Sequence, residues 1–415
     1  MAALLDPSSS TADNALKRPR DSPTTLYCAC LGRLGQFGNQ IFQFAFATLC
    51  ARIHSLDLVC PDWIGRYCFP SASKFATAPP ASRVLVADRV VLSHAGWRAW
   101  ASQRAPLSSF GELSGKRLRA EMPQVNASSL SETNALCCAG AQHVPSGGCL
   151  ELWGWFQFGT ADYAPHRAAL ADAFALAPAL QALVDSALAA VLDGAETLVC
   201  VHVRCSDDYA ALADGAYARG GGGAGVDRGW RREPADGDEA AEDVDLPPEW
   251  RDDGVFWAAP IEWYCAWLRE LWPKLRAPRL LLCTDDADRA LSGGLAEFAP
   301  AQLAPLLRAD AGRWAAAHAA CGDALTDGAL EMLCDWAALR AADVIAVSNS
   351  TFSFSAALLA DEPRAALPPD VARFWRPYPA ERRLVPFEPW DASPTLNAAT
   401  FEKGDTAHAS PQTTT

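Results

Sequence analysis

The sequence has no long apolar run, and this absence bears first on membranes. No uninterrupted apolar stretch reaches the roughly 20 residues that a membrane-spanning helix requires. Residues 1–25 are polar, lack the apolar centre of a signal peptide and are expected to be a disordered arm. We therefore expect no membrane span, and a cytoplasmic location for the sequence as written.

An excess of positive charge is also absent. The sequence carries 35 Lys and Arg against 49 Asp and Glu, a formal net charge of -14. The stretch between Asp227 and Asp253 contributes roughly half of that charge. Proteins that bind nucleic acids neutralise phosphates with basic side chains. We therefore expect no nucleic-acid partner.

Metal-ligand spacing is missing among the 14 cysteines. They are scattered through apolar stretches, where a thiol behaves as a small hydrophobic side chain, and no pair has the spacing of a zinc site. We expect most of them to be buried free thiols. In a secreted protein, Cys137, Cys138 and Cys149 would be the place for a disulfide bridge.

The sequence does contain apolar strands that alternate with helical stretches. At 415 residues and 50% hydrophobic composition, the chain can bury two ordinary cores. The alternation predicts an α/β fold with parallel sheets. Residues 210–254, glycine-rich and then acidic, are expected to be a flexible, disordered insertion, and residues 391–415 a disordered tail. Strands are expected within 25–31, 56–61, 197–204, 279–284 and 343–348, and helices within 41–53, 165–192, 261–275, 328–342 and 352–360.

Glycines at every third position from Gly32 to Gly38 separate the first expected strand from the first helix. A dinucleotide-binding loop in this place needs the spacing G-x-G-x-x-G and an acidic residue further along, for which Asp62 would serve. Here two residues separate the first two glycines, and the loop ends in the polar pair Asn39 and Gln40. The spacing does not favour the dinucleotide interpretation.

The strand expected at 197–204 ends in His202 and Arg204, which alternate onto one face. Ligands bind at the carboxyl ends of parallel strands, and the planar guanidinium of arginine fits phosphate oxygens. The pair is a candidate phosphate or diphosphate site, with a structural salt bridge as the alternative.

Five small polar residues lie where the strand at 343–348 passes into the helix at 352–360. Free backbone N–H groups at a helix start bind anions, and hydroxyl groups add further donors. One N-cap needs only one hydroxyl, so the excess favours an anion site over simple capping. The five are Ser348, Asn349, Ser350, Thr351 and Ser353.

Carboxylates follow the strand at 279–284, at Asp285, Asp286 and Asp288. Three uses are open. Asp285 or Asp286 can bind the donor edge of guanine, Asp286 and Asp288 can hold a divalent metal as a D-x-D pair, or one carboxylate can cap a helix. The sequence does not rank these uses.

Together and in this order, the stretches resemble motifs of glycosyltransferase family 11, the α-1,2-fucosyltransferases. The segment GRLGQFGNQIFQFAF is similar to the family's G-R-L-G-N-Q-x-F-Q-Y-A, and LELWGWFQFGTADY to its G-Y-F-Q. VHVRCSDDY is similar to H-x-R-R-G-D-Y, LLLCTDD to F-S-D-D, and the serine-rich turn to N-S-T-F-S-W-W. The resemblance runs from about residue 26 to residue 377 and omits both tails and the acidic insertion.

The resemblance implies a GT-B fold, in which two Rossmann-like domains face a cleft. Residues 26–190 would form the acceptor side, and residues 191–390 would bind GDP-fucose. The implied enzyme is an inverting glycosyltransferase that moves L-fucose from GDP-β-L-fucose to a glycan acceptor, at O2 of a galactoside, and needs no metal or other cofactor. Eukaryotic members are usually anchored in the Golgi membrane, so a Golgi location is the alternative to a cytoplasmic one.

The resemblance also implies roles for individual residues. Arg204 would bind the β-phosphate and stabilise the charge on departing GDP, and Asp207, or its neighbour Asp208, is the candidate general base. The implied substrate-binding residues are His202 and Asp285 or Asp286 for guanine or ribose, Ser350, Thr351 and Ser353 for phosphate, and Asn39 and Gln40 for the diphosphate or the acceptor.

One departure from the family pattern concerns the strand that carries Arg204. The family's second arginine is Cys205 in this chain. This departure raises one alternative, a catalytically inactive relative that only binds nucleotide or glycan. The other alternative rests on Asp286 and Asp288 as a D-x-D pair: a metal-dependent glycosyltransferase that uses another nucleotide sugar.

Overall fold

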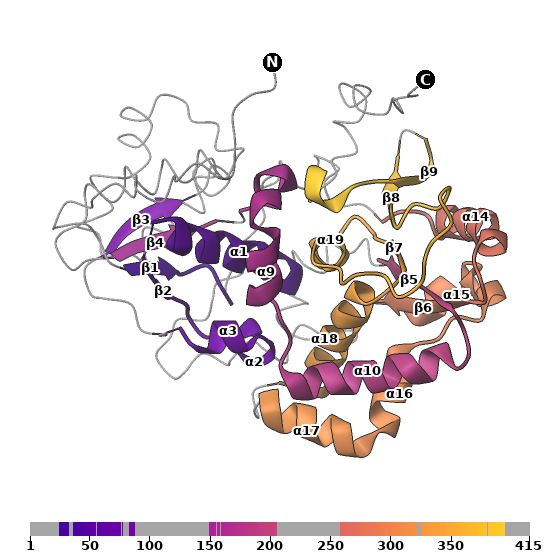
Figure 1. Cartoon of the computed structure of the whole chain (residues 1–415), viewed down its shortest axis with the longest axis horizontal. Coiled ribbons are helices and arrows are strands. Elements are labelled where there is room, and N and C mark those ends of the chain that lie inside the picture. The colour runs from indigo at the N-terminus through magenta and orange to yellow at the C-terminus, as the bar shows by residue number, and fades with distance from the viewer. Residues whose placement is uncertain are drawn as a thin grey trace.

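The computed structural model describes residues 25–32, 36–54, 56–75, 77, 83–87, 149–154, 156–157, 159–205, 258–321, 325–379 and 381–394. In these residues the strands form two sheets, one of four strands and one of five, with helices packed against them (Figure 1). The predicted α/β class with parallel sheets is confirmed. The insertion at 210–254 lies outside the described residues, as do the arm before Thr25 and the tail beyond Pro394.

The first sheet is wholly parallel, and helix α1 (Phe37–His54) follows its central strand β1 and packs against it. Strand β1 is buried along its whole length, as expected of a parallel strand with neighbours on both sides. In sheet order the strands are β2 (Asp57–Val59), β1 (Thr25–Cys28), β4 (Cys149–Trp153) and β3 (Arg83–Ala87).

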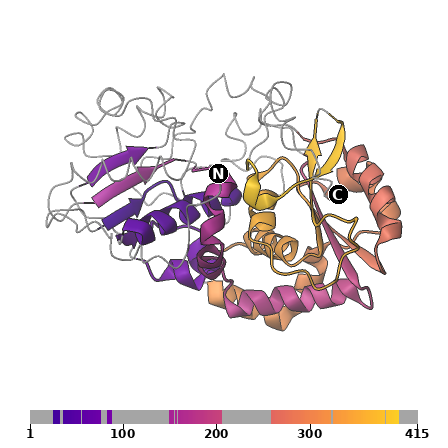
Figure 2. The same ribbon diagram turned by 45° about the horizontal axis from the view of Figure 1, so that its top comes forward.

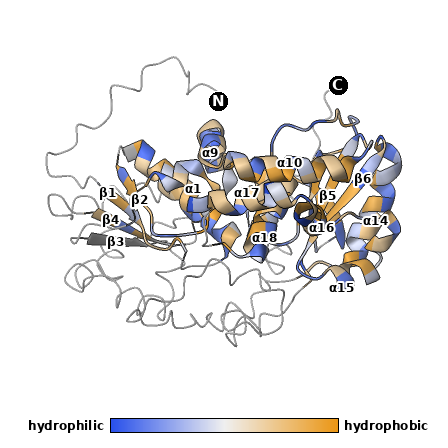
Figure 3. Ribbon diagram, turned by 90° about the horizontal axis from the view of Figure 1, so that it is seen from below, coloured by the Kyte–Doolittle hydropathy of each residue, from blue (hydrophilic) through white to orange (hydrophobic). Residues whose placement is uncertain are grey.

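The second sheet is parallel except for its last strand, which pairs in antiparallel fashion. In sheet order the strands are β6 (Pro278–Thr284), β5 (Thr197–Val203), β7 (Val344–Ala346), β8 (Phe374–Tyr378) and β9 (Arg383–Pro386). The residues of β5 and β6 are mainly apolar and buried, which Figure 3 shows as orange ribbon.

The two faces of this sheet are covered by different helices. Val199 and Val201 of β5 pack in a core with α14 (Ile261–Leu271). Cys200, one position between them, points to the other face and packs in the core that includes α10 (Pro178–Leu192) and α18 (Asp327–Arg340). His202 continues this second face by the period-two alternation of a strand.

One predicted helix is wrong. The helix expected over 165–192 is two helices, α9 (Arg167–Ala173) and α10, separated by residues 174–177. Pro178 is the first residue of α10, and Ala177 before it has an extended conformation (φ -57, ψ 136), which the proline ring favours. Within the described residues no single helix is long and apolar enough to cross a membrane; the bent pair 160–173 and 178–192 passes that test by length and composition only.

Further elements were not predicted from the sequence. Seen from below in Figure 3, α17 lies beside α10, with which it is in contact. Helix α19 (Thr351–Leu358) lies where a helix was expected, within 352–360. The elements that were not expected are α2 (Gly65–Cys68), α3 (Pro70–Ser73), α15 (Ala287–Ser292), α16 (Leu303–Ala309), α17 (Ala311–Cys321), and the short 3₁₀ turns Thr160–Asp162, Ala164–His166, Trp272–Lys274, Leu295–Phe298 and Pro389–Asp391.

Helices α1 and α18 lie between the two sheets (Figures 1 and 2). A single hydrophobic core continues from the first sheet to the α18 side of the second. Phe37 at the start of α1 meets Trp336 of α18 edge-on, with ring centroids 5.5 Å apart. The buried Arg340 of α18 donates a hydrogen bond to the carbonyl oxygen of Phe174 at 2.8 Å. The two sheets are therefore joined by direct packing, while the predicted domain limits stay a prediction.

Near the end of the described residues, the segment after the second sheet packs against residues 160–167. Thr160 is fully buried, and its hydroxyl donates to the carbonyl oxygens of Pro389 at 2.6 Å and Ala392 at 2.9 Å. Arg167 lies over the ring of Trp390 at 4.7 Å. Ala392, which the sequence analysis assigned to the tail, is thus part of the packed structure.

The described cysteines are buried free thiols, as expected from their apolar surroundings. Each of the twelve described cysteines is buried and free. Cys149 is among them, while Cys137 and Cys138 lie outside the described residues.

Candidate active site

The carboxyl ends of β5 and β7 meet at one edge of the second sheet, because the two strands pair in parallel. His202 is the penultimate residue of β5, and Ser348 lies two residues beyond β7. His202 Nδ1 and Ser348 Oγ are 2.7 Å apart. Two of the polar strand ends singled out in the sequence are therefore in direct contact.

His202 is neutral at pH 7. Burial lowers the pKa of its imidazole to about 4; Asp285 acts in the opposite direction, and the charge of Arg204 lowers the pKa further. A neutral imidazole has one donor and one acceptor nitrogen. Because Ser348 contacts Nδ1, the ring can meet a ligand through Nε2 by hydrogen bonding but not as a cation.

Arg204 supplies the positive charge at this edge. It is half-buried just beyond β5, near enough to His202 to influence the pKa of that ring. Among the residues that the structure describes, its guanidinium has neither a hydrogen bond nor an ion pair. A half-buried cation without a protein counter-ion is an attractive position for an anionic ligand.

The glycine stretch reaches the same place from the other half of the chain. A Cβ atom at Gly38 would lie 2.6 Å from the Cα of Phe352 and overlap its backbone nitrogen. Only glycine therefore allows the first turns of α1 and α19 to touch. The ring of Phe352 lies 5.2 Å from that of His202, so this contact brings α1 to the end of β5.

Asn39 bridges the two halves beside this contact. Its Oδ1 accepts hydrogen bonds from Thr351 Oγ1 at 2.8 Å and from Gln157 Nε2 at 2.7 Å. Gln157 was not singled out in the sequence, although it is the glutamine of the segment that resembles G-Y-F-Q. Gln40, the neighbour of Asn39, has a fully buried side chain.

The serine-rich turn uses much of its polarity internally. Ser350 is the N-cap of α19 and accepts from the Phe352 N–H at 3.3 Å, so the capping interpretation holds for this residue. Ser353 is fully buried, and its hydroxyl accepts from the Ser348 N–H at 3.2 Å. The predicted phosphate contacts of these hydroxyls stay predictions.

The carboxylates after β6 have protein partners. Asp285 accepts from the Cys205 N–H at 2.6 Å, which ties the ends of β5 and β6 together. Asp286 caps α15 by accepting from the Arg289 N–H at 3.0 Å, and Asp288 is exposed on the first turn. Within the described part of the chain no group of three or more His, Cys, Asp or Glu side chains is placed to hold a metal ion.

Cys205, the departure from the family pattern, faces away from His202. Its side chain is 2% exposed and packs in the core that contains Val203 and Tyr264, on the α14 side of the sheet. Its Sγ lies 3.5 Å from Thr284 Oγ1. The substitution therefore lies on the face of the sheet opposite the contact between His202 and Ser348.

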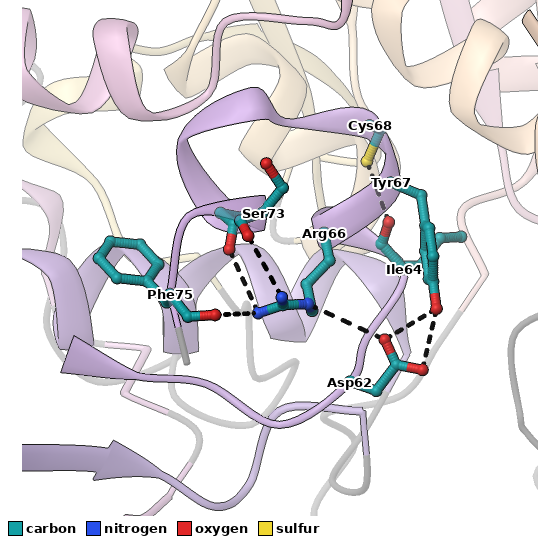
Figure 4. Close-up of polar contacts among 8 residues, drawn as sticks. Asp62, Ile64, Arg66, Tyr67, Cys68, Ser73 and Phe75 are labelled. Atoms are coloured by element: carbon teal, nitrogen blue, oxygen red, sulfur yellow. Dashed lines mark hydrogen bonds and ion pairs between the residues drawn. The ribbon is translucent and has the colours of Figure 1, made fainter. Parts of the chain in front are cut away.

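Asp62, the acidic residue of the dinucleotide interpretation, belongs to a local structural network (Figure 4). Its two carboxylate oxygens accept from the hydroxyl of Tyr67 at 2.8 and 2.9 Å, and Arg66 lies 4.0 Å away. Gly32 has φ 71, and a Cβ there would lie 2.6 Å from the carbonyl oxygen of Asp62. The first glycine of the stretch therefore serves a tight turn.

The candidate base Asp207 and its neighbour Asp208 lie outside the described residues, as does Gly35. The structure thus brings together His202, Arg204, Ser348, Phe352, Asn39 and Gln157, with Asp285 at the adjacent strand end.

No protein-family model matches the chain, and no curated protein matches its sequence. Solved structures give distant likenesses. The crystal structure of POFUT1 in complex with GDP-fucose covers 85% of this chain and 98% of its own, at 11% identity and a TM-score of 0.38. NodZ alpha-1,6-fucosyltransferase soaked with GDP-fucose covers 81% and 91%, at 13% identity and a TM-score of 0.37. NodZ from Bradyrhizobium covers 81% and 91%, at 14% and 0.36. These values are too low for roles of residues in those enzymes to be transferred.

Proposed function

We propose that the protein is a fucosyltransferase that transfers L-fucose from GDP-β-L-fucose to a sugar hydroxyl. The observation that carries the proposal is Arg204, a half-buried cation without a protein counter-ion among the described residues, at the strand end where the motifs that resemble family 11 converge. A nucleotide diphosphate is an anion suited to that position.

The surroundings of Arg204 support diphosphate binding. Helix α1 and helix α19 both begin at this edge, and Gly38 holds their first turns against each other. The free N–H groups and the positive end of a helix dipole favour phosphate oxygens. His202 would add a neutral hydrogen bond to ribose or guanine, and Asp285 lies at the neighbouring strand end.

The reaction is an inverting displacement at C1 of fucose. The acceptor hydroxyl oxygen forms the new bond to C1 while the bond from C1 to the β-phosphate oxygen breaks, and its electron pair leaves with GDP. Arg204 stabilises that developing charge. The proton of the acceptor hydroxyl passes to a base, for which Asp207 is our candidate. A galactoside O2 is the acceptor position that the motifs imply, and no metal ion is part of the proposal.

A panel of nucleotide sugars tests this function. Purified protein is incubated with GDP-fucose, GDP-mannose, UDP-galactose and UDP-N-acetylglucosamine, with lactose as acceptor, and GDP or UDP release is measured. We expect acceptor-dependent release from GDP-fucose alone, unchanged by EDTA, and a fucosylated product whose linkage is read by glycan analysis.

The alternatives give different results in the same assay. Release from a UDP-sugar that EDTA abolishes and manganese restores would contradict the proposal and favour a D-x-D enzyme. GDP binding without turnover of any donor would indicate an inactive relative.

A further inference from the structure

The Asn39 amide has two polar side-chain neighbours, Gln157 and Thr351. Its Oδ1 accepts from Gln157 Nε2 at 2.7 Å and from Thr351 Oγ1 at 2.8 Å. A carbonyl oxygen has two lone pairs, so this acceptor is fully used. Within the described residues the Asn39 NH₂ group makes no hydrogen bond, so two N–H donors remain for a ligand.

Phe156, the residue before Gln157, is held by several contacts, and these restrict the position of Gln157. Phe156, immediately before it, is a buried aromatic residue with φ 50, a conformation that bulky residues rarely adopt. Phe156 stacks on Phe46 of α1 with ring centroids 4.3 Å apart, and its carbonyl oxygen accepts from Tyr163 Oη at 3.0 Å. Strain of this kind persists where the surrounding structure enforces it, and it clusters at functional sites.

Thr351 approaches Asn39 from the other half of the molecule. It is the first residue of α19 and precedes Phe352, whose ring lies 5.2 Å from His202. Asn39 is in the first turn of α1. The amide is therefore gripped between the two halves at the edge of the site that contains Arg204.

We propose that Gln157 and Thr351 are positioning residues that hold the Asn39 amide with its NH₂ group toward the diphosphate of the donor nucleotide. The inference rests on the proposed function, because it names GDP as the anion that receives these N–H donors. In the reverse orientation the carbonyl oxygen would face the phosphates and repel them.

The Asn39→Asp variant tests the orientation directly. Aspartate keeps an acceptor for both Gln157 and Thr351 but replaces the N–H donors with a negative oxygen. We expect N39D to fold as stably as N39A and to bind GDP at least roughly tenfold more weakly than N39A, measured by calorimetry. Equal GDP binding by N39D and the native protein, or lower stability of N39D than of N39A, would overturn the orientation.

Double-mutant cycles test the positioning roles without relying on one variant. Gln157→Met and Thr351→Val each remove a donor to Asn39, and Thr351→Ser keeps it. We expect Q157M and T351V to weaken GDP binding several-fold and T351S to rescue it. In an N39A background these losses should vanish, because both residues act through Asn39. Additive losses would mean that they act independently, against the proposal.

A matched control and the native protein separate the two proposals. Gln181→Met removes a similar amide on α10 that donates to Asp185 at 2.8 Å, and it should leave GDP binding unchanged. If the native protein does not bind GDP, the proposed function fails and the inference with it. If it binds GDP and N39D binds equally well, only the inference about Asn39 fails.

Discussion

Two half-buried arginines at the edges of the two sheets are treated in opposite ways. Arg66, beyond β2, donates to the carbonyl oxygens of Phe75 at 2.8 Å and Ser73 at 3.3 Å and lies 4.0 Å from Asp62 (Figure 4). Arg204, beyond β5, has no hydrogen bond or ion pair among the described residues. A satisfied guanidinium stabilises the fold, whereas an unsatisfied one is available for a ligand. The comparison therefore indicates a structural role for Arg66 and a ligand-binding role for Arg204.

The largest effect is expected from Arg204→Ala. Loss of the cation that stabilises departing GDP should lower turnover of GDP-fucose by roughly 10²- to 10³-fold, with an unchanged unfolding midpoint because no described partner is left unpaired. Product formation and thermal unfolding are measured together. Arg204→Lys should retain part of the activity, and the control Arg313→Ala, at an exposed position of α17, should retain all of it. Full activity in R204A would refute the site.

Gly38→Ala tests the contact between the first turns of α1 and α19, which brings α1 to the strand end that carries Arg204. The added Cβ would overlap the Phe352 backbone and lie 2.6 Å from its Cα, so α1 and α19 must separate, at a cost of about 3 kcal/mol in unfolding free energy. GDP binding should weaken as well, because the two helix starts diverge. Urea unfolding and calorimetry measure the two effects. Gly159→Ala is the control, since nothing lies within 4 Å of a Cβ there. Similar stability of both variants would contradict the packing.

Arg66→Ala should show the reverse of Arg204→Ala. Its side chain is 16% exposed, and removing it leaves the carbonyl oxygens of Ala72, Ser73 and Phe75 without this donor, which costs about 2 kcal/mol. Activity per folded molecule should be retained. Arg279→Ala, an exposed residue of β6, should change neither quantity. If R66A lost activity at full stability, the distinction between the two arginines would not hold.

The sequence predicted secondary structure best for the strands that are buried on both faces. The apolar runs around Thr25–Cys28, Thr197–Val203 and Pro278–Thr284 are strands as predicted, because burial on both faces requires continuous apolar side chains. The break before Pro178 was missed, since alanine and leucine on both sides of it favour a helix. Strand β8 has only one buried residue, and its sequence shows no alternation of apolar and polar residues that would predict a strand.

Several residues that the structure brings together were named from the sequence, but their contacts were not. His202, Ser348 and Asn39 lie together as the ordered motifs suggested. Gln157 was missed because its partner is 118 residues away along the chain, and its own surroundings read as an aromatic core segment. The inward direction of Ser353 depends on how α19 starts, a detail of backbone geometry that residue types do not reveal.

Asp335 of α18 differs from both arginines because its side chain can lose its charge by taking up a proton. Burial, together with Glu331, raises the pKa of its carboxyl from 3.8 to about 7, whereas an arginine keeps its charge. The unfolded chain therefore releases this proton at lower pH than the folded one, and stability is lost as the pH rises from about 4 to 7. Asp335→Asn should raise the unfolding free energy by about 1–2 kcal/mol at pH 8 and change it little at pH 4.

Asp310 is the control for that measurement, because its pKa is shifted in the opposite direction. Hydrogen bonds from Arg313 lower the pKa of Asp310, so its stabilisation is present above pH 4 and disappears as the pH falls. Asp310→Asn should therefore destabilise the protein at pH 8, only slightly because the carboxylate is partly exposed to solvent, in contrast to D335N. Urea unfolding at both pH values distinguishes the two. If D335N were destabilising at pH 8, Asp335 would be charged and paired in the folded protein, and it would join Arg66 among the satisfied charges.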